Sequence, residues 1–466
     1  MNRRKFLHHS AAAVALTALA PRRLFAGDKT PPLSATLTVQ ESETLATIPE
    51  DYVGLSYESA QLANPAFFAA ENTALIALFR ELSEKGVLRI GGGTSEFTAF
   101  TTEETASKPP FDAVGPDTSK NVKSDTPVTP TSLRNLRAFL DAAGWRCLYG
   151  LNLGRGKAEN AAIEASYVAN ILGGRLIAFQ LGNEPDAWRK RYRPETWSYE
   201  DYRKEWFAAH AAVVERVPHA KFAGPDVSNK IAFITGFAED AKKSAPDVVL
   251  LTSHYYRMGP AGAPDITLDK LLSPDAKLAR DMNTIMEAAR GAGLPYRMCE
   301  GNSCWNGGQP GLSDSLASAL WAADMMLEFA SLGCAGVNLH GGGNGFYTPI
   351  AGSLAAGFAR RPEYFGIEIA QSFAGATLLR STLDCSNDRV RAYVARKGGH
   401  TLLLVVNKTP QPVTLATPYK TSHHEWLLSG PAIDAKDGIK LEQNPAKLLR
   451  DGVLNAPPFS ITLVEA

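Results

Sequence analysis

The sequence predicts an α/β protein in which a (β/α)8 TIM barrel is followed by a C-terminal antiparallel β-sandwich. Between residues 51 and 370, eight short apolar runs alternate with helix-length segments or long loops, which is the pattern of such a barrel. From residue 371 to 466 the pattern changes to short β-like runs separated by Gly, Asn, Pro and Lys clusters. An alternating run at residues 35–41 has no helix behind it, so we expect the segment 27–50 to add a strand to the β-domain.

Residues 1–26 resemble a twin-arginine export signal. The segment begins with Asn-Arg-Arg-Lys-Phe-Leu at residues 2–7, continues with an apolar run at 11–20 and offers a cleavage site after Ala26. That run is too short to span a bilayer. We therefore expect an exported protein, periplasmic or secreted, with no membrane insertion.

The composition is that of a globular protein with a large core, with 45% hydrophobic and 21% charged residues. Cleavage after Ala26 would leave 43 basic and 48 acidic residues, and so a net charge of −5. This acidic balance argues against a nucleic-acid-binding protein. The five cysteines are too few for a disulfide framework and lack zinc-ligand spacing, so we expect buried thiols, with one disulfide as the alternative.

The elements of the barrel follow from apolar runs and helix caps. The expected strands are residues 52–58, 87–91, 146–151, 176–181, 221–224, 248–254, 296–300 and 336–340. The expected helices include residues 74–85, 133–143, 202–215 and 315–331, with N-caps at Asn72, Thr131-Ser132 and Ser313-Asp314. A doubly wound sheet is the alternative, but no Gly-x-Gly-x-x-Gly follows the first strand. The polar segment 101–130 is either a wall of the site or a surface insertion.

Two glutamates end two of these strands. Glu184 follows the fourth strand and Glu300 ends the seventh, so both side chains should point across the same mouth of the barrel. Glycoside hydrolysis uses such a pair, one carboxyl as acid and the other as nucleophile, ~5–5.5 Å apart when configuration is retained. Glu184 is the better acid/base candidate because Asn183 beside it can hold a sugar 2-hydroxyl. Glu300 is then the nucleophile.

Aromatic and histidine side chains gather at the same strand ends. They are His254, Tyr255 and Tyr256 after the sixth strand, Trp305 after Glu300 and Tyr347 after the eighth strand. Aromatic rings cover the apolar faces of sugars, while phenol and imidazole groups reach hydroxyls. Tyr256 could also hydrogen-bond Glu300 and keep it ionised. The pattern favours a saccharide pocket.

Four stretches of the chain carry distinctive motifs. They are Cys-Glu-Gly-Asn-Ser at 299–303 with Trp-Asn-Gly-Gly-Gln-Pro-Gly at 305–311, Ala-Gly-Val-Asn-Leu-His-Gly-Gly-Gly at 335–343, Gln-Leu-Gly-Asn-Glu-Pro-Asp at 180–186, and Gly-Trp-Arg at 144–146 with Tyr-Gly-Leu-Asn at 149–152. These motifs resemble those of glycoside hydrolase family 79, the family of β-glucuronidases and heparanases, and its bacterial β-glucuronidases in particular. The resemblance covers about residues 35–466. It implies a retaining enzyme with Glu184 as acid/base and Glu300 as nucleophile.

The resemblance also implies a sugar-binding subsite. Matching positions that line it are Glu58, Asn183, Tyr256 and His340, and positions that match the binding of a substrate carboxylate are Gly307, through its backbone, and Tyr347. At Trp305 the bacterial β-glucuronidases have a Tyr whose hydroxyl helps to bind that carboxylate, and Trp offers only an indole N–H. Arg257 is one candidate for the missing contact.

Three functions stay open from the sequence. The first is an exo-β-glucuronidase, since no basic cluster of the kind a sulfated polymer requires marks the barrel face. The second is a β-glycosidase for a modified uronide, such as a 4-O-methyl-glucuronide, or for a neutral sugar. The third is an exported carbohydrate-binding protein without turnover. We expect no cofactor or metal, and the aglycone, substrate length and oligomeric state are left open.

Overall fold

The computed structural model describes residues 31–104, 126–341, 345–445 and 447–466. The predicted signal segment and most of the 101–130 segment lie outside these ranges. The chain divides after Pro31, and all elements below belong to the unit Pro32–Ala466. No helix among the described residues combines the length and apolarity needed to cross a membrane.

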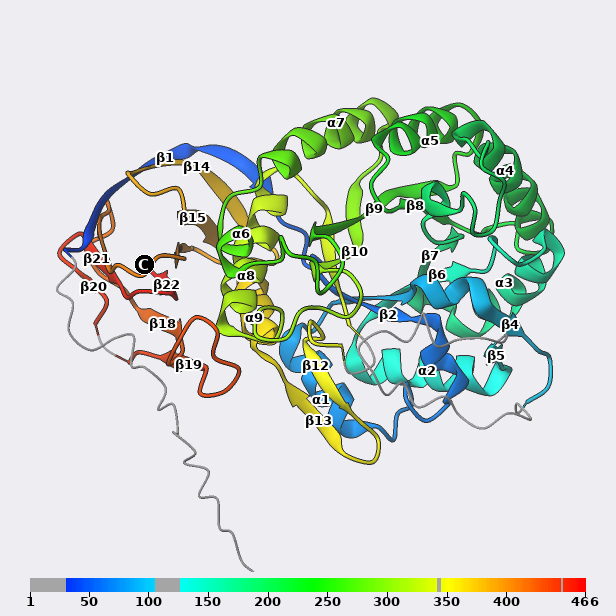
Figure 1. Cartoon of the computed structure of the whole chain (residues 1–466), viewed down its shortest axis with the longest axis horizontal. Helices are drawn as coiled ribbons and strands as arrows, with labels where there is room; N and C mark the ends of the chain where they lie inside the picture. The colour runs from blue at the N-terminus through cyan, green and yellow to red at the C-terminus, as the bar shows by residue number, and fades with distance from the viewer. Residues whose placement is uncertain (1–30, 105–125, 342–344, 446) are drawn as a thin grey trace, which may run out of the picture. The chain divides into compact units, whose positions relative to one another are not determined.

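Eight parallel strands close into a barrel, as the sequence predicted (Figure 1). Going round, each strand pairs with the next and the last with the first. In chain order they are β2 (Val53–Glu58), β3 (Val87–Gly91), β6 (Arg146–Leu151), β7 (Leu176–Leu181), β8 (Phe222–Val227), β9 (Val248–Met258), β10 (Tyr296–Cys304) and β11 (Gly336–His340). Strands β9 and β10 are each four residues longer than predicted, because they keep pairing with one another past the rim, up to Met258 opposite Cys304.

Helices surround the barrel, and their caps explain their starts. They are α1 (Thr73–Leu82), α2 (Pro130–Ala143), α3 (Ala158–Leu172), α4 (Tyr199–Arg216), α5 (Ile231–Ser244), α6 (Leu268–Leu272), α7 (Ala276–Ala292), α8 (Leu316–Ser331) and α9 (Pro362–Gln371). The Asn72 side chain accepts the Leu75 N–H, which confirms the predicted cap of α1. The predicted start of α2 was wrong, because Thr129 and Ser132 form a capping box and Pro130 opens the helix.

The short elements lie mainly in the loops. The short helices of 3-10 type are η1 (Ser59–Ala63), η2 (Gly93–Phe97), η3 (Gly173–Arg175) and η4 (Pro185–Ala187), and the two-stranded sheets are β4 (Thr98–Phe100) with β5 (Thr126–Val128) and β12 (Ile350–Ser353) with β13 (Gly357–Arg360). Of these, η2 and η4 follow barrel strands β3 and β7, and both contribute to the site described below.

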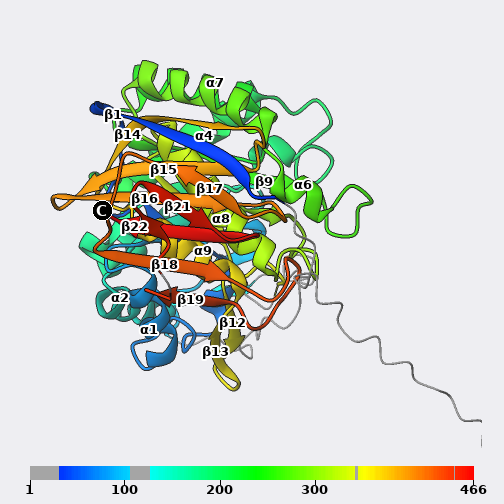
Figure 2. The same cartoon turned by 90° about the vertical axis from the view of Figure 1, so that its left-hand side faces the viewer.

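The C-terminal region forms the predicted antiparallel β-domain, as one curled, mainly antiparallel sheet of ten strands (Figure 2). Its order is β19-β18-β22-β16-β15-β14-β1-β17-β21-β20. The strands are β1 (Leu33–Thr47), β14 (Thr377–Cys385), β15 (Val390–Lys397), β16 (His400–Asn407), β17 (Val413–Ala416), β18 (His424–Ser429), β19 (Lys440–Gln443), β20 (Leu449–Arg450), β21 (Val453–Ala456) and β22 (Ser460–Glu465). The N-terminal strand β1 lies between β14 and β17, which confirms its predicted place in the β-domain.

Strand β16 shows how the sheet joins the barrel. Leu402, Leu404 and Val406 belong to the core cluster that contains the barrel and its helices, whereas Leu403 and Val405 belong to a core inside the curled sheet. This alternation is the period of two that a strand buried on both faces produces. One sheet face therefore packs on the barrel and the other closes on itself.

Candidate active site

The chain around Glu184 is held in an unusual conformation after β7. Gly182 and Glu184 both have positive φ, 82° and 49°, and Glu184 lies in the left-handed region that non-glycine residues rarely adopt. Neighbouring strands fix the turn, since Glu184 donates its N–H to the Asp226 carbonyl at 2.9 Å and Asn183 donates its N–H to Glu96 at 2.6 Å. Such a conformation costs ~1–3 kcal/mol and persists only when its surroundings impose it.

Glu300 lies within β10, just after a register shift against β9. Both of its carboxylate oxygens accept hydrogen bonds, one from Arg89 at 2.6 Å and the other from the Tyr256 hydroxyl at 2.9 Å. The Tyr256 contact is the one that the sequence predicted. Two donors and a guanidinium charge make this an environment for an ionised carboxylate.

Arg89 is the hub of the site, and sequence reasoning missed it. It rises from the middle of β3, is 1% exposed, and besides Glu300 it donates to Asp226 at 2.5 Å and to Asn183 at 2.8 Å. A signal was present: an arginine inside an apolar strand must find buried partners, because an unpaired buried charge is prohibitively costly.

Glu96 and Asp226 were also missed. Glu96, in η2, accepts the N–H groups of Leu153 and Gly154 as well as that of Asn183, and so ties the loops after β6 and β7 together. Burial raises the pKa of Glu96 to about 7, against the effect of these donors. Asp226 is the last residue but one of β8, the barrel strand next to β7. The sequence offers no local signal for either, since both act through partners far along the chain.

His254 connects the two glutamates. Its Nδ1 lies 3.0 Å from a Glu184 oxygen and 4.0 Å from a Glu300 oxygen, and its Nε2 lies 3.2 Å from Asp226. A carboxyl oxygen of each glutamate and a ring nitrogen of His254 all lie within 4.8 Å of one another. These three groups could ligate a metal ion, but the Glu300 oxygens already accept from Arg89 and Tyr256, so the arrangement fits acid–base chemistry better.

The two carboxyl groups have opposite electrostatic environments. Burial raises the pKa of Glu184, and this outweighs the lowering effect of His254. Burial also acts on Glu300, but the charges of His340, His254 and Arg89 and the Tyr256 hydrogen bond overcome it and hold the pKa of Glu300 well below its usual range. Paired groups whose pKa values are pushed apart are what an acid and a nucleophile need.

The other predicted sugar-binding residues surround this pair. Glu58 accepts from the Thr94 N–H at 2.8 Å and lies 3.5 Å from His340 Nε2, while His340 Nδ1 lies 3.9 Å from Glu300. The Tyr347 ring centroid lies 5.8 Å from that of His340 and 6.4 Å from that of Tyr256. The structure therefore brings Glu58, His340 and Tyr347 to the same mouth as the glutamates.

Gly307 and Trp305 lie at the rim. The Gly307 carbonyl accepts the Phe346 N–H at 2.5 Å, which joins the loops after β10 and β11, and its φ of 81° suits glycine. Trp305 is 44% exposed, and its carbonyl accepts the Ala261 N–H at 3.0 Å. Its side chain is therefore exposed to solvent at the end of the barrel where β10 finishes.

Two residues considered from the sequence point elsewhere. The Tyr255 hydroxyl donates to Asp275 at 2.9 Å, because alternation along β9 turns this side chain away from the barrel axis. Arg257 pairs with the same Asp275 at 3.1 Å and donates to three backbone carbonyls. Its guanidinium is thereby held by these contacts away from the glutamate pair, so the structure gives no support to the hypothesis that it binds a substrate carboxylate.

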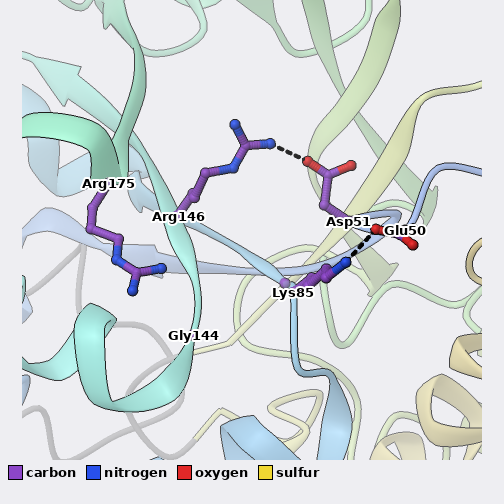
Figure 3. Close-up of a pocket in the computed structure, with 7 residues that line it drawn as sticks. Glu50, Asp51, Lys85, Gly144, Arg146 and Arg175 are labelled. Carbon is purple, nitrogen blue, oxygen red and sulfur yellow. Dashed lines mark hydrogen bonds and ion pairs between the residues drawn. The ribbon is translucent and has the colours of Figure 1, made fainter.

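A second cavity, of about 470 Å³, lies at the opposite end of the barrel (Figure 3). It is lined by Glu50, Asp51, Lys85, Gly86, Gly144, Arg146 and Arg175, which precede or begin strands β2, β3, β6 and β7. Two ion pairs cross it, Lys85 with Glu50 and Arg146 with Asp51. In barrels of this kind the amino ends of the strands serve stability, so we place the site at the other end.

No family model matches the chain. Two curated proteins are similar to it, both named beta-glucuronidase. The one from Aspergillus niger is 25% identical over 395 residues, 75% of this chain and 71% of that protein. The one from Neurospora crassa is 27% identical over 328 residues, 62% of this chain and 56% of that protein, so the match spans little more than half of its length.

Solved structures share the fold. A 4-O-alpha-L-rhamnosyl-beta-D-glucuronidase from Fusarium oxysporum 12S superposes with a TM-score of 0.69 at 17% identity, over 93% of this chain and 100% of that one. A GH51 arabinofuranosidase from Xanthomonas axonopodis pv. citri gives a TM-score of 0.68 at 15% identity, over 93% and 99% of the two chains. The chain is a glycoside hydrolase. At these identities the structural similarity concerns the fold, and the sugar must be argued from the site.

Proposed function

We propose that this glycoside hydrolase is a retaining exo-β-glycosidase, most specifically a β-glucuronidase of the family 79 type. The observation that carries the proposal is the Glu184–Glu300 pair, bridged by His254, with oxygens within 4.8 Å. Retaining enzymes place their carboxyl groups about 5–5.5 Å apart, and inverting enzymes about 6.5–9.5 Å, to leave room for a water molecule. The short approach favours direct attack by Glu300.

The proposed reaction has two steps. In the first, a Glu300 oxygen forms a bond to the anomeric carbon while the glycosidic bond breaks. The leaving oxygen keeps the electron pair of the broken bond and takes the proton of Glu184. In the second, Glu184 removes a proton from water, whose oxygen displaces Glu300 and restores the starting configuration. The low pKa of Glu300 keeps it ionised for attack, and the raised pKa of Glu184 keeps its proton available.

The sugar assignment rests on the rim of the pocket. The similarity to two proteins named beta-glucuronidase supports a glucuronide, with Gly307 and Tyr347 contacting its carboxylate. A second candidate is a glucuronide that carries a substituent, because the exposed Trp305 offers a ring face at the pocket edge, and the Fusarium protein of the same fold is a rhamnosyl-glucuronidase. We also propose that the protein is exported, on the evidence of its twin-arginine-like segment.

The test is hydrolysis of 4-nitrophenyl β-glucuronide beside the matching β-glucoside and a 4-O-substituted β-glucuronide, using residues 27–466. We expect turnover of a glucuronide with retention at the anomeric carbon, followed by proton NMR, and a fall of at least ~1000-fold in Glu300→Gln. Glu184→Gln should keep more activity on activated leaving groups, which need little protonation. Hydrolysis of the glucoside alone would refute the sugar assignment. Binding without any turnover would instead support the carbohydrate-binding alternative.

A further inference from the structure

The side chain of His254 is fully buried between charged groups contributed by four other barrel strands or the turns that follow them. Facing it are Glu184 after β7, Asp226 on β8, Glu300 on β10 and Arg89 on β3, and Tyr256 follows it on its own strand. No other described residue has this arrangement of one imidazole between the two proposed catalytic carboxyls and a third acid. Its role goes beyond sugar binding.

The Asp226 carboxylate fixes the orientation of the imidazole ring. One Asp226 oxygen lies 3.2 Å from His254 Nε2, and the other accepts from Arg89 at 2.5 Å. Gln180 donates to the first oxygen as well, at 2.6 Å, so Asp226 is an acceptor on all sides. Nε2 must therefore carry a hydrogen and donate it to Asp226.

The protonation of Nδ1 then decides how Glu184 is used. A neutral ring would present a lone pair to the Glu184 oxygen 3.0 Å away, and would draw the Glu184 proton to that oxygen. The proton would then point at His254 and not at the substrate. A charged ring donates its own Nδ1–H to that oxygen, so the other Glu184 oxygen keeps the transferable proton. Glu184 remains 27% exposed, which leaves this second oxygen open to the pocket.

We propose that His254 is a permanently protonated positioning residue, which is anchored on Asp226 and directs the acidic proton of Glu184 towards the leaving group. The inference rests on the proposed function and extends it to the residue that controls where the Glu184 proton lies. Burial lowers the pKa of His254, but Asp226, Glu300 and Glu184 together raise it to about 10. Its charge also stabilises the Glu184 carboxylate that remains after proton transfer, and so makes Glu184 a stronger acid than burial alone would allow.

The decisive variant is His254→Asn, whose amide can still donate to Glu184 but carries no charge. Without the cation the pKa of Glu184 rises, so the basic limb of the kcat/KM profile should move up by at least ~1 pH unit. Hydrolysis of phenyl β-glucuronide should fall at least ~10-fold more than that of 2,4-dinitrophenyl β-glucuronide, since only the poor leaving group depends on the acid. His210→Asn is the matched control, because His210 on α4 pairs with Asp247 in the turn before β9, and neither residue belongs to the site.

If His254→Asn lost the same activity on both substrates and the basic limb of its kcat/KM profile did not move, the inference would be overturned and the proposed function would stand. Absence of turnover by the unmodified protein would overturn both. A second measurement does not depend on how the variant folds: nitrogen NMR of the unmodified protein with labelled histidine. We expect the His254 ring to keep both nitrogens protonated throughout pH 5–8. The pKa of His340 is also raised, by Glu300 and Glu58, so its signal is first assigned from its loss in His340→Asn and set aside. If every remaining histidine becomes neutral by pH 8, the inference is wrong.

Discussion

At the scale of single residues, Glu164 and Glu96 are two of the buried acids for which burial favours the protonated form. Glu164 on α3 is 3% exposed and accepts the Tyr149 hydroxyl at 2.7 Å, and burial raises the pKa of Glu164 from 4.5 to about 7. Glu96 shows the same shift but also holds the loops of the site. A variant of Glu164 therefore tests the effect of a buried carboxyl on stability without a change in the site.

We predict that Glu164→Gln flattens the pH dependence of stability without changing turnover. The folded-state pKa lies above the unfolded one, so the stabilising contribution is complete below pH 4.5 and is lost as the pH rises through about 7. The full difference corresponds to about 3 kcal/mol. Urea denaturation at pH 4.5 and pH 7.5 should show a smaller difference in unfolding free energy for the variant. An equal difference in unfolding free energy between the two pH values for both proteins would show that Glu164 is not the titrating group.

The sequence predicted the two glutamates but not the residues that set their chemistry. Glu184 and Glu300 each follow an apolar run, and a strand end is a local pattern. Arg89 lies 94 and 211 residues from its partners Asn183 and Glu300, so only closure of the barrel brings them together. Asp226 depends in the same way on Arg89 and His254.

At the scale of elements, a loop of the β-domain completes a barrel helix. The first N–H groups of α8, at Leu316 and Ala317, donate to the carbonyls of Ala435 and Ile433 at 2.9 and 3.0 Å. Ser315, the N-cap, makes no side-chain cap bond, so the loop supplies acceptors on the neighbouring turn. The loop thereby lies against the start of α8, which follows the segment that carries Gly307.

Lys436 extends this contact towards the pocket rim. It pairs with Asp314 at 2.8 Å, and its Nζ lies 5.9 Å from the Phe346 ring centroid, next to Tyr347. We predict that Lys436→Met raises KM for the glucuronide by roughly two- to fivefold with kcat unchanged, since a half-exposed pair contributes up to about 1 kcal/mol. Lys440→Met, on the exposed strand β19, is the control for loss of a lysine. An unchanged KM would mean that the loop supports α8 alone.

Element ends illustrate the same limit of sequence patterns. The starts of β3, β6, β7, β9, β10 and β11 were predicted at the correct residue, because the apolar runs begin abruptly there. The ends of β9 and β10 were predicted four residues early, because residues 255–258 and 301–304 do not continue the apolar run and are held by pairing between the two strands. The β-domain was predicted as a class, but its strand order was not, since that order depends on contacts such as that of β1 with β14.

At the scale of the unit 32–466, barrel and β-sheet share a buried ion pair. Lys408, after β16, contacts Asp324 on α8 at 2.5 Å, with side chains 4% and 8% exposed, and the Tyr393 hydroxyl donates to Asp324 at 2.7 Å. Around them the core cluster runs without a break from the barrel into the sheet. This continuity indicates that the two parts unfold together.

We predict that Lys408→Met destabilises the whole unit by about 3–5 kcal/mol, because it removes the closest cation of the buried Asp324 and leaves only Arg391, 3.9 Å away, as a countercharge. Calorimetry should still show one transition at a lower Tm. Lys243→Met is the control, since the Lys243–Glu239 pair on α5 is exposed and its loss should change stability by no more than ~0.5 kcal/mol. Separation into two transitions would show that the barrel folds independently of the sheet.

The left-handed backbone conformation of Glu184 creates a trade-off between activity and thermal stability. Glycine adopts this conformation freely, and exchange for glycine at such a position gains stability if the side chain does little packing. A laboratory selection for thermal survival alone would thus favour loss of the proposed acid. Selection for turnover would oppose it. Any engineering of this chain for use at high temperature should therefore couple the two screens, or hold position 184 fixed.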